Sequence, residues 1–547
     1  MKKFLLFLCS WLIVSLGQPS FSYWFSIGAA CVGFALFFHL LSQEDNSKRR
    51  FYLGWGWYTL VQMVWLTWSW GHPYSYIYIL YVLASLFLGL QFGILALFVT
   101  EKRIRQFSGI LMLSALWTLI EYSRLYLFSG HPWHPIGLAL SANLYSRQFA
   151  ALLGTYGLTF WVMLTNLFFA RALQTRIWSP RGLAFAVVAA TPYLFGWAVV
   201  SHHHALVDDS ETLRVALVQT VFPIEETLPF EARGDYLAYI LEEWRTILTL
   251  TQPLGDDQVD LIVLPELVVP AGTYYLIFDL KEVKQLFVEV FGPEAAMKMA
   301  PLEQHLASRE ASGQVLVNNA YMLQSLANVT GSDVIAGLED YEWGSGGEHL
   351  AYTAAYLFSK EGELPKRYEK RILVPMGEYI PFSFLRTLAA SYGISGSFTA
   401  GESAKVFDID KASVGFSICY EELFGGLMKE NKDEGATLLV NLTSDIWYEG
   451  YGLPRVHLEH ARLRPVEMGL PLIRSCNTGV TCVIDSLGRD VARHGETPQE
   501  EEKEPGLLVA NVPLHTYSTP YLFWGDRGIL LLSILFLVPL LRRPGKG

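Results

Sequence analysis

Long apolar runs alternate with short polar segments through the first 200 residues of the chain. The runs lie at about residues 4–17, 23–42, 52–70, 75–99, 108–128, 148–171 and 183–200, and one more lies at 527–541. Most of them are long enough to cross the ~30 Å hydrocarbon core of a bilayer as helices. The pattern therefore predicts a multi-span helical membrane bundle of about eight helices, seven before a long polar segment and one after it.

Basic residues cluster in every second loop between these runs. The clusters comprise Lys2, Lys3, Lys48, Arg49, Arg50, Lys102, Arg103, Arg105, Arg171, Arg176, Arg181, Arg542, Arg543 and Lys546. Loops 18–22, 71–74 and 129–146 contain no Lys or Arg. Because cytoplasmic loops retain basic residues, the N-terminus is expected in the cytoplasm and residues 201–520 on the other side of the membrane.

The first apolar run has a second interpretation. It has only 14 residues and follows two lysines, as the apolar region of a cleaved signal peptide does. Cleavage would leave the lysine pair without a role in the alternation of basic loops. We therefore expect a retained helix.

From Leu213 the pattern changes to short β-branched runs separated by polar helices, which is typical of a layered α/β domain. Strands are expected at residues 214–219, 259–266, 333–339, 353–359, 413–421, 436–443, 470–476 and 480–485. Helices are expected at residues 231–250, 281–311 and 455–469. The predicted parts are a transmembrane domain at 1–205, a catalytic domain at 206–520 with a helical insertion at 272–330, and a terminal helix with a basic tail at 521–547.

Charge separates the same parts and excludes one class of partner. Residues 1–200 and 521–547 together hold 17 basic and 5 acidic residues, whereas the middle segment holds 24 basic and 47 acidic ones. An acidic domain does not attract nucleic acid, because phosphate binding needs the opposite sign.

The five cysteines show no CxxC spacing, so we expect neither a metal site nor a cofactor, and we expect Cys476 and Cys482 to be buried thiols. We expect His202, His203 and His204 to form a solvated linker.

Three predicted strand ends carry candidate chemistry. Glu266 ends an apolar strand in VLPE, Lys370 and Glu378 lie in RYEKRILVPMGEYIPF (367–382), and Cys419 lies in VGFSICYEELF (414–424). Taken singly, the charged residues are typical of a solvated surface and the cysteine of a buried thiol. We expect Glu422, in the acidic run after the cysteine, to be a solvated residue at a helix start. Together, in this order across one domain, the three segments indicate a common site.

These motifs resemble the nitrilase, or carbon-nitrogen hydrolase, superfamily. Adding NLTSDIWY (441–448) and HLEHARLRPVEMGLPLIRSCNTGVT (457–481) extends the resemblance to bacterial apolipoprotein N-acyltransferases over nearly the whole chain. GHPWHPIG (130–137) is similar to that family's Gly-x-Pro-Trp segment. The resemblance implies an α-β-β-α sandwich for the catalytic domain.

The resemblance also implies a mechanism and its residues. Cys419 would be the nucleophile, Glu266 its general base, and Lys370 the cation that favours the thiolate and stabilises the oxyanion. The supporting or substrate-binding residues would be Glu378, Tyr420, Glu421 and Trp447. The donor would be a phospholipid, phosphatidylethanolamine, which leaves a thioester, and the acceptor would be the amine of a diacylglyceryl lipoprotein, in a ping-pong transfer. We expect a monomer in the bacterial inner membrane, in contact with membrane lipid, with its catalytic domain in the periplasm.

Two other functions remain open at this point. A membrane-tethered amidase or nitrilase would use the same three residues on a soluble substrate. A transport or scaffold protein without catalysis would explain Glu121 and Arg124 inside one predicted span, although we expect these two to pair with each other. The predicted spans favour acyl transfer, because a soluble substrate needs no bilayer.

Overall fold

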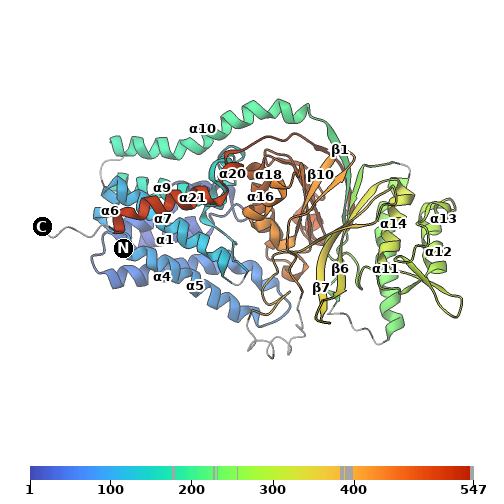
Figure 1. The fold of residues 1–547 in the computed structure, drawn as a ribbon. Coiled ribbons are helices and arrows are strands. Elements are labelled where there is room, and N and C mark those ends of the chain that lie inside the picture. Colours follow the sequence, from blue (N-terminus) through green and yellow to red (C-terminus); the bar gives the residue numbers. More distant parts are fainter. Residues whose placement is uncertain are drawn as a thin grey trace.

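A bundle of helices forms one end of the molecule and two β-sheets form the other, as Figure 1 shows for the computed structural model. The structure describes residues 1–541 except 128, 175–178, 226–227, 229, 231, 256, 382–386 and 388–397. Arg176, Arg542, Arg543 and Lys546, which belong to the predicted basic loops, lie outside the described residues.

Every apolar run predicted from the sequence contributes helix to the bundle. The helices are α1 (Lys2–Ser15), α2 (Tyr23–Gly28), η1 (Ala29–Gly33), α3 (Phe34–Ser42), α4 (Ser47–Trp65), η2 (Leu66–Gly71), α5 (Ile77–Phe98), α6 (Glu101–Arg105), α7 (Phe107–Ser123), η3 (Arg124–Tyr126), η4 (Ile136–Leu140), α8 (Leu144–Arg147), α9 (Ala150–Leu173), α10 (Pro180–Asp208), α20 (Pro520–Trp524) and α21 (Asp526–Leu541). Their shared core is rich in aromatic rings, among them Trp57, Tyr58, Phe92 and Trp117.

Four helical segments in the described part of the chain are long and apolar enough to cross a membrane. They are Tyr23–Ser42, Ile77–Phe98, Ala150–Leu173 and Pro180–Asp208. The predicted number of about eight is therefore too high by this measure. Helices α1, α7 and α21 have 14, 17 and 16 residues and fall short of the 18 that the measure requires. Helix α4 has three basic residues near its start. The apolar run predicted at 52–70 extends past the end of α4 into the 3₁₀ helix η2.

Glu121 and Arg124 pair inside the bundle, as predicted. Arg124 Nη1 lies 3.6 Å from Glu121 Oε1, and both side chains are buried. Arg124 also donates to Gln91 at 2.7 Å, and Glu121 accepts from the Ile136 amide at 3.1 Å. A buried charge is tolerated where it is paired and hydrogen-bonded, so this pair fixes the loop before η4 rather than forming a transport path.

Helix α10 leads from the bundle to the sheets along one flank of the molecule (Figure 1). The prediction that His202, His203 and His204 form a solvated linker is wrong for one of them. All three lie in the last turns of α10, and His203 Nδ1 is 3.1 Å from His515 Nε2 and stacks on Tyr517. The helix end is thus anchored against the segment that returns to the bundle.

The catalytic half contains two six-stranded sheets. The first has the order β15-β1-β2-β6-β7-β8, and the second has the order β14-β13-β12-β11-β10-β9. The strands of the first are β1 (Thr212–Gln219), β2 (Leu261–Val263), β6 (Asp333–Trp343), β7 (His349–Phe358), β8 (Lys366–Glu369) and β15 (Gly506–Pro513). Those of the second are β9 (Val406–Ile409), β10 (Ala412–Ile418), β11 (Leu438–Thr443), β12 (Leu472–Cys476), β13 (Cys482–Ile484) and β14 (Asp490–Arg493). All eight predicted strands are present.

The sheets pack face to face, with helices on both outer sides. Apolar side chains from both sheets, such as Val215, Ile335, Phe416 and Val440, share one buried core. Helices α11 (Arg233–Thr251) and α14 (Asn319–Thr330) cover the first sheet. Helices α16 (Gly425–Asp433), α17 (Leu453–Ala461) and α18 (Leu463–Met468) cover the second, and Figure 1 shows α16 and α18 between that sheet and the bundle. The predicted α-β-β-α sandwich is confirmed.

The insertion at 272–330 is only partly helical. It contains α12 (Leu280–Phe291), α13 (Ala295–Lys298) and α14, together with a small sheet of β3 (Phe278–Asp279), β5 (Val315–Val317) and β4 (Ala307–Arg309). The helix predicted over 281–311 ends early, because Gly292 adopts φ +86° and a proline follows it.

The bundle and the catalytic half are joined by buried polar contacts. Glu467 in α18 accepts from the Thr155 amide of α9 at 2.7 Å and pairs with Arg464 at 3.1 Å. Gln148, before α9, donates to the Leu487 carbonyl at 2.7 Å. Because each of these buried groups has a hydrogen-bond partner across the interface, the two halves hold each other in a fixed orientation.

Candidate active site

Cys419 stands at the point where β10 ends and the short 3₁₀ helix η8 (Cys419–Leu423) begins. Its backbone has φ +50°, a left-handed conformation that residues other than glycine rarely adopt. The strand was predicted to run to residue 421, but it stops at Ile418. A nucleophile on a strained turn between strand and helix projects from the edge of its sheet, where a substrate can reach it.

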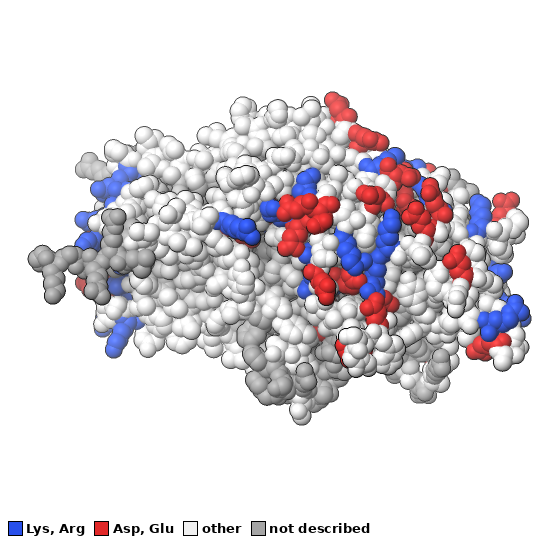
Figure 2. All heavy atoms as spheres, in the orientation of Figure 1, with Lys and Arg blue, Asp and Glu red and all other residues white. Residues whose placement is uncertain are grey.

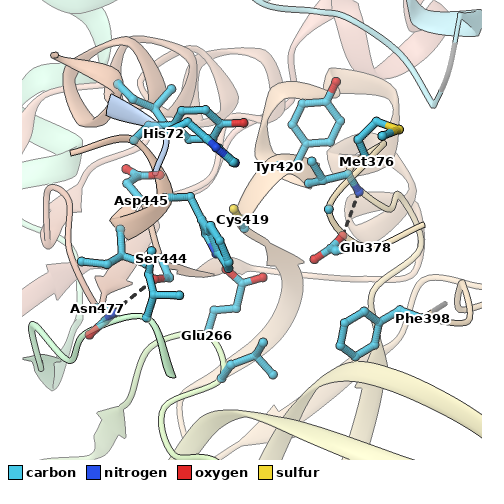
Figure 3. A pocket seen from close by; sticks show the side chains of 18 of the residues that line it. His72, Glu266, Met376, Glu378, Phe398, Cys419, Tyr420, Ser444, Asp445 and Asn477 are labelled. Atoms are coloured by element: carbon cyan, nitrogen blue, oxygen red, sulfur yellow. Dashed lines mark hydrogen bonds between the residues drawn. The ribbon is translucent and has the colours of Figure 1, made fainter. Parts of the chain in front are cut away.

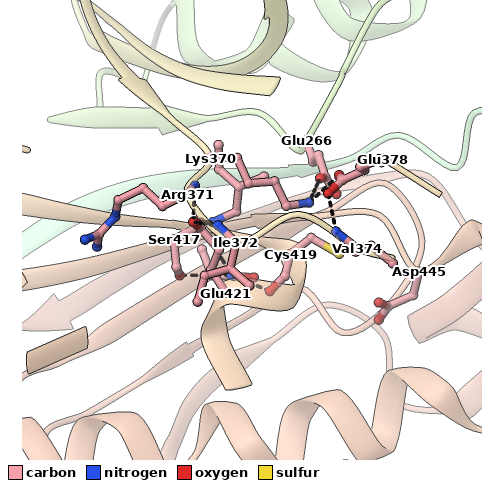
Figure 4. Close-up of polar contacts among 12 residues, drawn as sticks. Glu266, Lys370, Arg371, Ile372, Val374, Glu378, Ser417, Cys419, Glu421 and Asp445 are labelled. Atoms are coloured by element: carbon pink, nitrogen blue, oxygen red, sulfur yellow. Dashed lines mark hydrogen bonds and ion pairs between the residues drawn. The ribbon is translucent and has the colours of Figure 1, made fainter. Parts of the chain in front are cut away.

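Lys370, directly after β8, is held between two carboxylates (Figure 4). Its Nζ lies 2.9 Å from Glu266 Oε1 and 2.6 Å from Glu378 Oε1, and its side chain is 1% exposed. Glu378 is held in turn by the Val374 amide, which donates to its second oxygen at 2.8 Å. The structure thus brings Glu266, Lys370 and Glu378 together, and Figure 4 shows the sulfur of Cys419 beside them.

The charge around the sulfur keeps the resting thiol protonated. Burial raises the pKa of Cys419 well above its usual value, and the charge of Glu266 raises it further. The charge of Lys370 lowers the pKa of Cys419, as expected from the sequence, but two carboxylates share that charge. The resting side chain of Cys419 is therefore a thiol and not a thiolate.

Glu266 is suited to receive that proton. The pKa of Glu266 is raised by burial, and the charge of Lys370 opposes this rise. Burial acts to lower the pKa of Lys370, yet the charges of Glu266 and Glu378 raise it well above its usual value. Lys370 therefore stays an ammonium while Glu266 is a stronger base than an exposed carboxylate.

Glu421 ties the nucleophile turn to the Lys370 loop. One of its oxygens accepts from the Arg371 and Ile372 amides at 2.6 and 3.1 Å. The other accepts from the Ile418 amide and the Tyr368 hydroxyl, both at 2.8 Å. All four contacts are to the protein itself, so this residue positions the site and does not line the cavity.

Tyr420 and Trp447 connect the site to the bundle. The Tyr420 hydroxyl donates to the Gly130 carbonyl at 2.9 Å, and its ring lies 5.9 Å from that of Trp133. Trp447, in the 3₁₀ helix η9 (Ile446–Tyr448), stacks on His72 with ring centroids 5.9 Å apart. Both residues face bundle segments that the sequence places far away.

A cavity of about 690 Å³ opens at Cys419. Figure 3 shows Cys419 in its centre with Glu266, Glu378, Tyr420 and Asp445 around it. The bundle contributes Trp68, His72, Tyr74, Tyr76, Ile77 and Leu80 to the remaining walls of the cavity. The helix η9 contributes Trp447 and Tyr448. The reacting groups therefore meet at a wall shared by the catalytic half and the apolar helices.

One expectation about this neighbourhood is wrong, and two residues were missed. Glu422 was expected to be solvated, but it is fully buried, with Oε2 3.0 Å from Arg474 Nε and 3.4 Å from His457 Nε2. The turn of η8 points its side chain beneath the second sheet instead of outward. His457 and Asp445 complete this buried group, and both lie in segments quoted for the family resemblance, 457–481 and 441–448, where no role was assigned to them. Among the described residues, no group of three or more His, Cys, Asp or Glu side chains is arranged to hold a metal ion.

Comparison with known proteins covers both halves of the chain. The carbon-nitrogen hydrolase family model matches residues 214–519, and the model of the apolipoprotein N-acyltransferase N-terminal domain matches residues 10–168. Among solved structures, the carbon-nitrogen hydrolase of Helicobacter pylori is similar at 15% identity and a TM-score of 0.33, over 61% of this chain and 95% of its own. A mutant amidase of the nitrilase superfamily from Nesterenkonia is 19% identical with a TM-score of 0.33, over 57% of this chain and 93% of its own.

Two relatives match along the full length. The apolipoprotein N-acyltransferase of Chlamydia caviae is 31% identical over 98% of this chain and 96% of its own. That of Chlamydia trachomatis is 34% identical over 96% of this chain and 94% of its own. On these matches to both halves, in order and over nearly the whole length, the chain belongs to the apolipoprotein N-acyltransferase family.

Proposed function

We propose that this enzyme moves an acyl chain from phosphatidylethanolamine to Cys419 and from there to the amine of a diacylglyceryl-cysteine lipoprotein. The observation that carries the proposal is the place of the reacting groups. Cys419, Glu266 and Lys370 meet at a cavity whose other wall is made by the apolar helices. N-acylation of lipoproteins is the function of the family; the donor, the thioester and the three catalytic residues are what we propose.

The first half-reaction forms the thioester. The Cys419 sulfur attacks the ester carbonyl carbon while its proton passes to Glu266, and the oxygen gains a negative charge that the Lys370 ammonium stabilises. The C–O bond then breaks, and Glu266 gives the proton to the departing lysophospholipid oxygen. Glu378 holds the Lys370 ammonium in position through the 2.6 Å contact between Oε1 and Nζ.

The second half-reaction consumes the thioester. The amine of the lipoprotein attacks the thioester carbon, Glu266 accepts a proton from the nitrogen, and the C–S bond breaks. The proton then returns to the Cys419 sulfur, which restores the resting thiol. Tyr420, Glu421 and Trp447 support both steps by fixing the nucleophile turn and the cavity wall.

The membrane bundle has a physical reason in this reaction. Both substrates are anchored by acyl chains, and moving such a chain into water costs about 0.8 kcal/mol per CH₂ group. A cavity walled by bundle residues such as Trp68, Ile77 and Leu80 lets the chains approach Cys419 without that cost. A soluble amide substrate would need no such wall.

The thioester can be trapped directly. Purified protein incubated with acyl-labelled phosphatidylethanolamine and no acceptor is expected to hold label on Cys419, released by hydroxylamine and transferred when a diacylglyceryl lipopeptide is added. Cys419→Ala is the control and should retain no label. Wild-type protein without label, or label lost to water as free fatty acid at the rate of transfer, contradicts the proposal and favours a hydrolase.

We propose that the catalytic half, residues 206–520 between a bundle at 1–205 and a terminal helix at 521–547, faces the periplasm from the bacterial inner membrane. On the face in Figure 2, Lys and Arg spheres lie at the far end of the bundle, few charges lie along it, and mixed charges cover the sheets. Basic residues that remain in the cytoplasm explain this distribution.

The proposed orientation can be tested by labelling in intact spheroplasts. A membrane-impermeant maleimide is expected to label Glu348→Cys, in the exposed loop after β6, and not Lys48→Cys, an exposed residue of the first basic loop. Lysis of the spheroplasts should make both positions reactive. Labelling of Lys48→Cys alone before lysis would reverse the orientation.

A further inference from the structure

A buried ion cluster lies directly behind the nucleophile and has no part in the chemistry described so far. His457 in α17 is 1% exposed. Its Nδ1 lies 3.0 Å from Asp445 Oδ1, and its Nε2 lies 3.2 Å from the carbonyl oxygen of Cys419 and 3.4 Å from Glu422 Oε2. Glu422 is paired in turn with Arg474 at 3.0 Å.

The contacts of His457 determine its protonation. Each ring nitrogen faces oxygen atoms of carboxylate or carbonyl groups, which accept hydrogen bonds. A neutral imidazole has one N–H and one lone pair, so one nitrogen would point a lone pair at an acceptor. Only the imidazolium, with an N–H on both nitrogens, satisfies both sides.

The hydrogen bond between His457 and the Cys419 carbonyl connects the cluster to the reacting centre through a single peptide group. The Cys419 carbonyl shares its peptide plane with the N–H of Tyr420, the residue that follows the nucleophile. That N–H lies in the first turn of η8, where amides have no acceptor within the helix. The amide after a nucleophile on such a turn is a usual donor to the oxyanion. A cation that donates to the carbonyl of this peptide polarises it, and the N–H becomes a stronger donor.

We propose that His457, as an imidazolium held by Asp445 and Glu422, orients and polarises the Cys419–Tyr420 peptide, so that the Tyr420 N–H and Lys370 together stabilise the oxyanion. His457 is a positioning residue here, because it acts through the peptide and not on the substrate. This inference rests on the proposed thioester mechanism. It also explains how the strained φ of +50° at Cys419 is maintained, since the charged hydrogen bond fixes the carbonyl on one side.

The charged and titratable groups around His457 come from each element packed against it. Asp445 precedes η9, Cys419 and Glu422 belong to η8, and Arg474 lies behind Glu422 on β12. Trp133, before η4, places its ring 5.8 Å away, and His460 lies one turn further along α17. Among the residues that the structure describes, the charged groups in direct contact with the imidazole are the carboxylates of Asp445 and Glu422.

Single-turnover acylation of Cys419 by labelled phospholipid, measured across pH, tests the proposal with His457→Gln. Glutamine can still donate one hydrogen bond, but it carries no charge and does not titrate. The rate at saturating lipid is expected to fall about 10-fold or more, short of the ~10²–10³ for loss of a whole oxyanion donor, with an unchanged KM.

His460→Gln is the matched control. His460 is equally buried on the same helix and touches the same Trp133 ring, but its nitrogens have no hydrogen-bond partner within the described residues. It should leave the rate and the pH profile unchanged. If His457→Gln does not fold, Asp445→Asn replaces it and should lower the rate with an unchanged KM, because the imidazole loses the carboxylate that holds its Nδ1.

An equal loss in the His457 and His460 variants, a His457→Gln enzyme that matches the wild type, or a variant that changes KM alone would each overturn the inference. These outcomes differ from failure of the proposed function itself, in which wild-type protein forms no thioester at any pH.

Discussion

Replacing Lys370 by methionine is expected to slow acylation of Cys419 by about 10²–10³-fold, the usual cost of losing a donor to the oxyanion. Lys370 is 1% exposed and provides the ammonium next to the sulfur, and methionine fills a similar volume without the charge. Rapid-quench measurement of label on Cys419 checks the rate. The KM for phospholipid should change little, because the charge acts on the transition state.

The same change should destabilise the protein, which calls for a second variant. Without the ammonium, Glu266 and Glu378 become two buried carboxylates with no cation between them, and breaking such a buried pair typically costs about 3–5 kcal/mol. Lys370→Met with Glu378→Gln removes one of the two charges and is expected to recover most of the melting temperature but not the rate. Recovery of the rate as well would mean that Lys370 has only a structural role.

Glu266→Gln is expected to lower the acylation rate at neutral pH by about 10²–10⁴-fold, because the amide cannot accept the thiol proton. The test compares the pH dependence of the acylation rate in the wild type and in the variant. In the wild type the rate should rise with pH as Glu266 loses its proton. In the variant it should rise only as the thiol itself ionises, and burial raises the pKa of Cys419 well above its usual value.

Glu378→Gln is the matched control for this change. Glu378 contacts the same ammonium at 2.6 Å, and its second oxygen accepts from the Val374 amide. The control variant should lose less activity and keep the wild-type pH dependence. If the two variants had the same pH profile, Glu266 would not be the base.

Much of the architecture could be predicted from the sequence, because it depends on local patterns. Each of the eight expected strands is a short apolar run with clear boundaries, and each apolar run of the bundle contributes helix. The order of the segments around Glu266, Lys370 and Cys419 was enough to expect a common site, and the structure brings the three together.

What the sequence could not reveal depends on contacts between distant segments. Whether Lys370 favours the thiolate depends on Glu378 sharing its charge. The burial of Glu422 depends on Arg474, some 50 residues further along the chain, since without that partner an acidic run after a cysteine is typical of a surface. The predicted number of membrane spans was too high for a similar reason. An apolar stretch of sequence does not show where an α-helix gives way to a 3₁₀ helix, as α4 does at η2.

The bond from the Tyr420 hydroxyl to the Gly130 carbonyl bears on biogenesis. Gly130 belongs to a loop of the bundle, so the residue next to the nucleophile takes its final position only after that loop has reached its own. A catalytic half without the bundle would therefore lack this anchor and one wall of the cavity at Cys419.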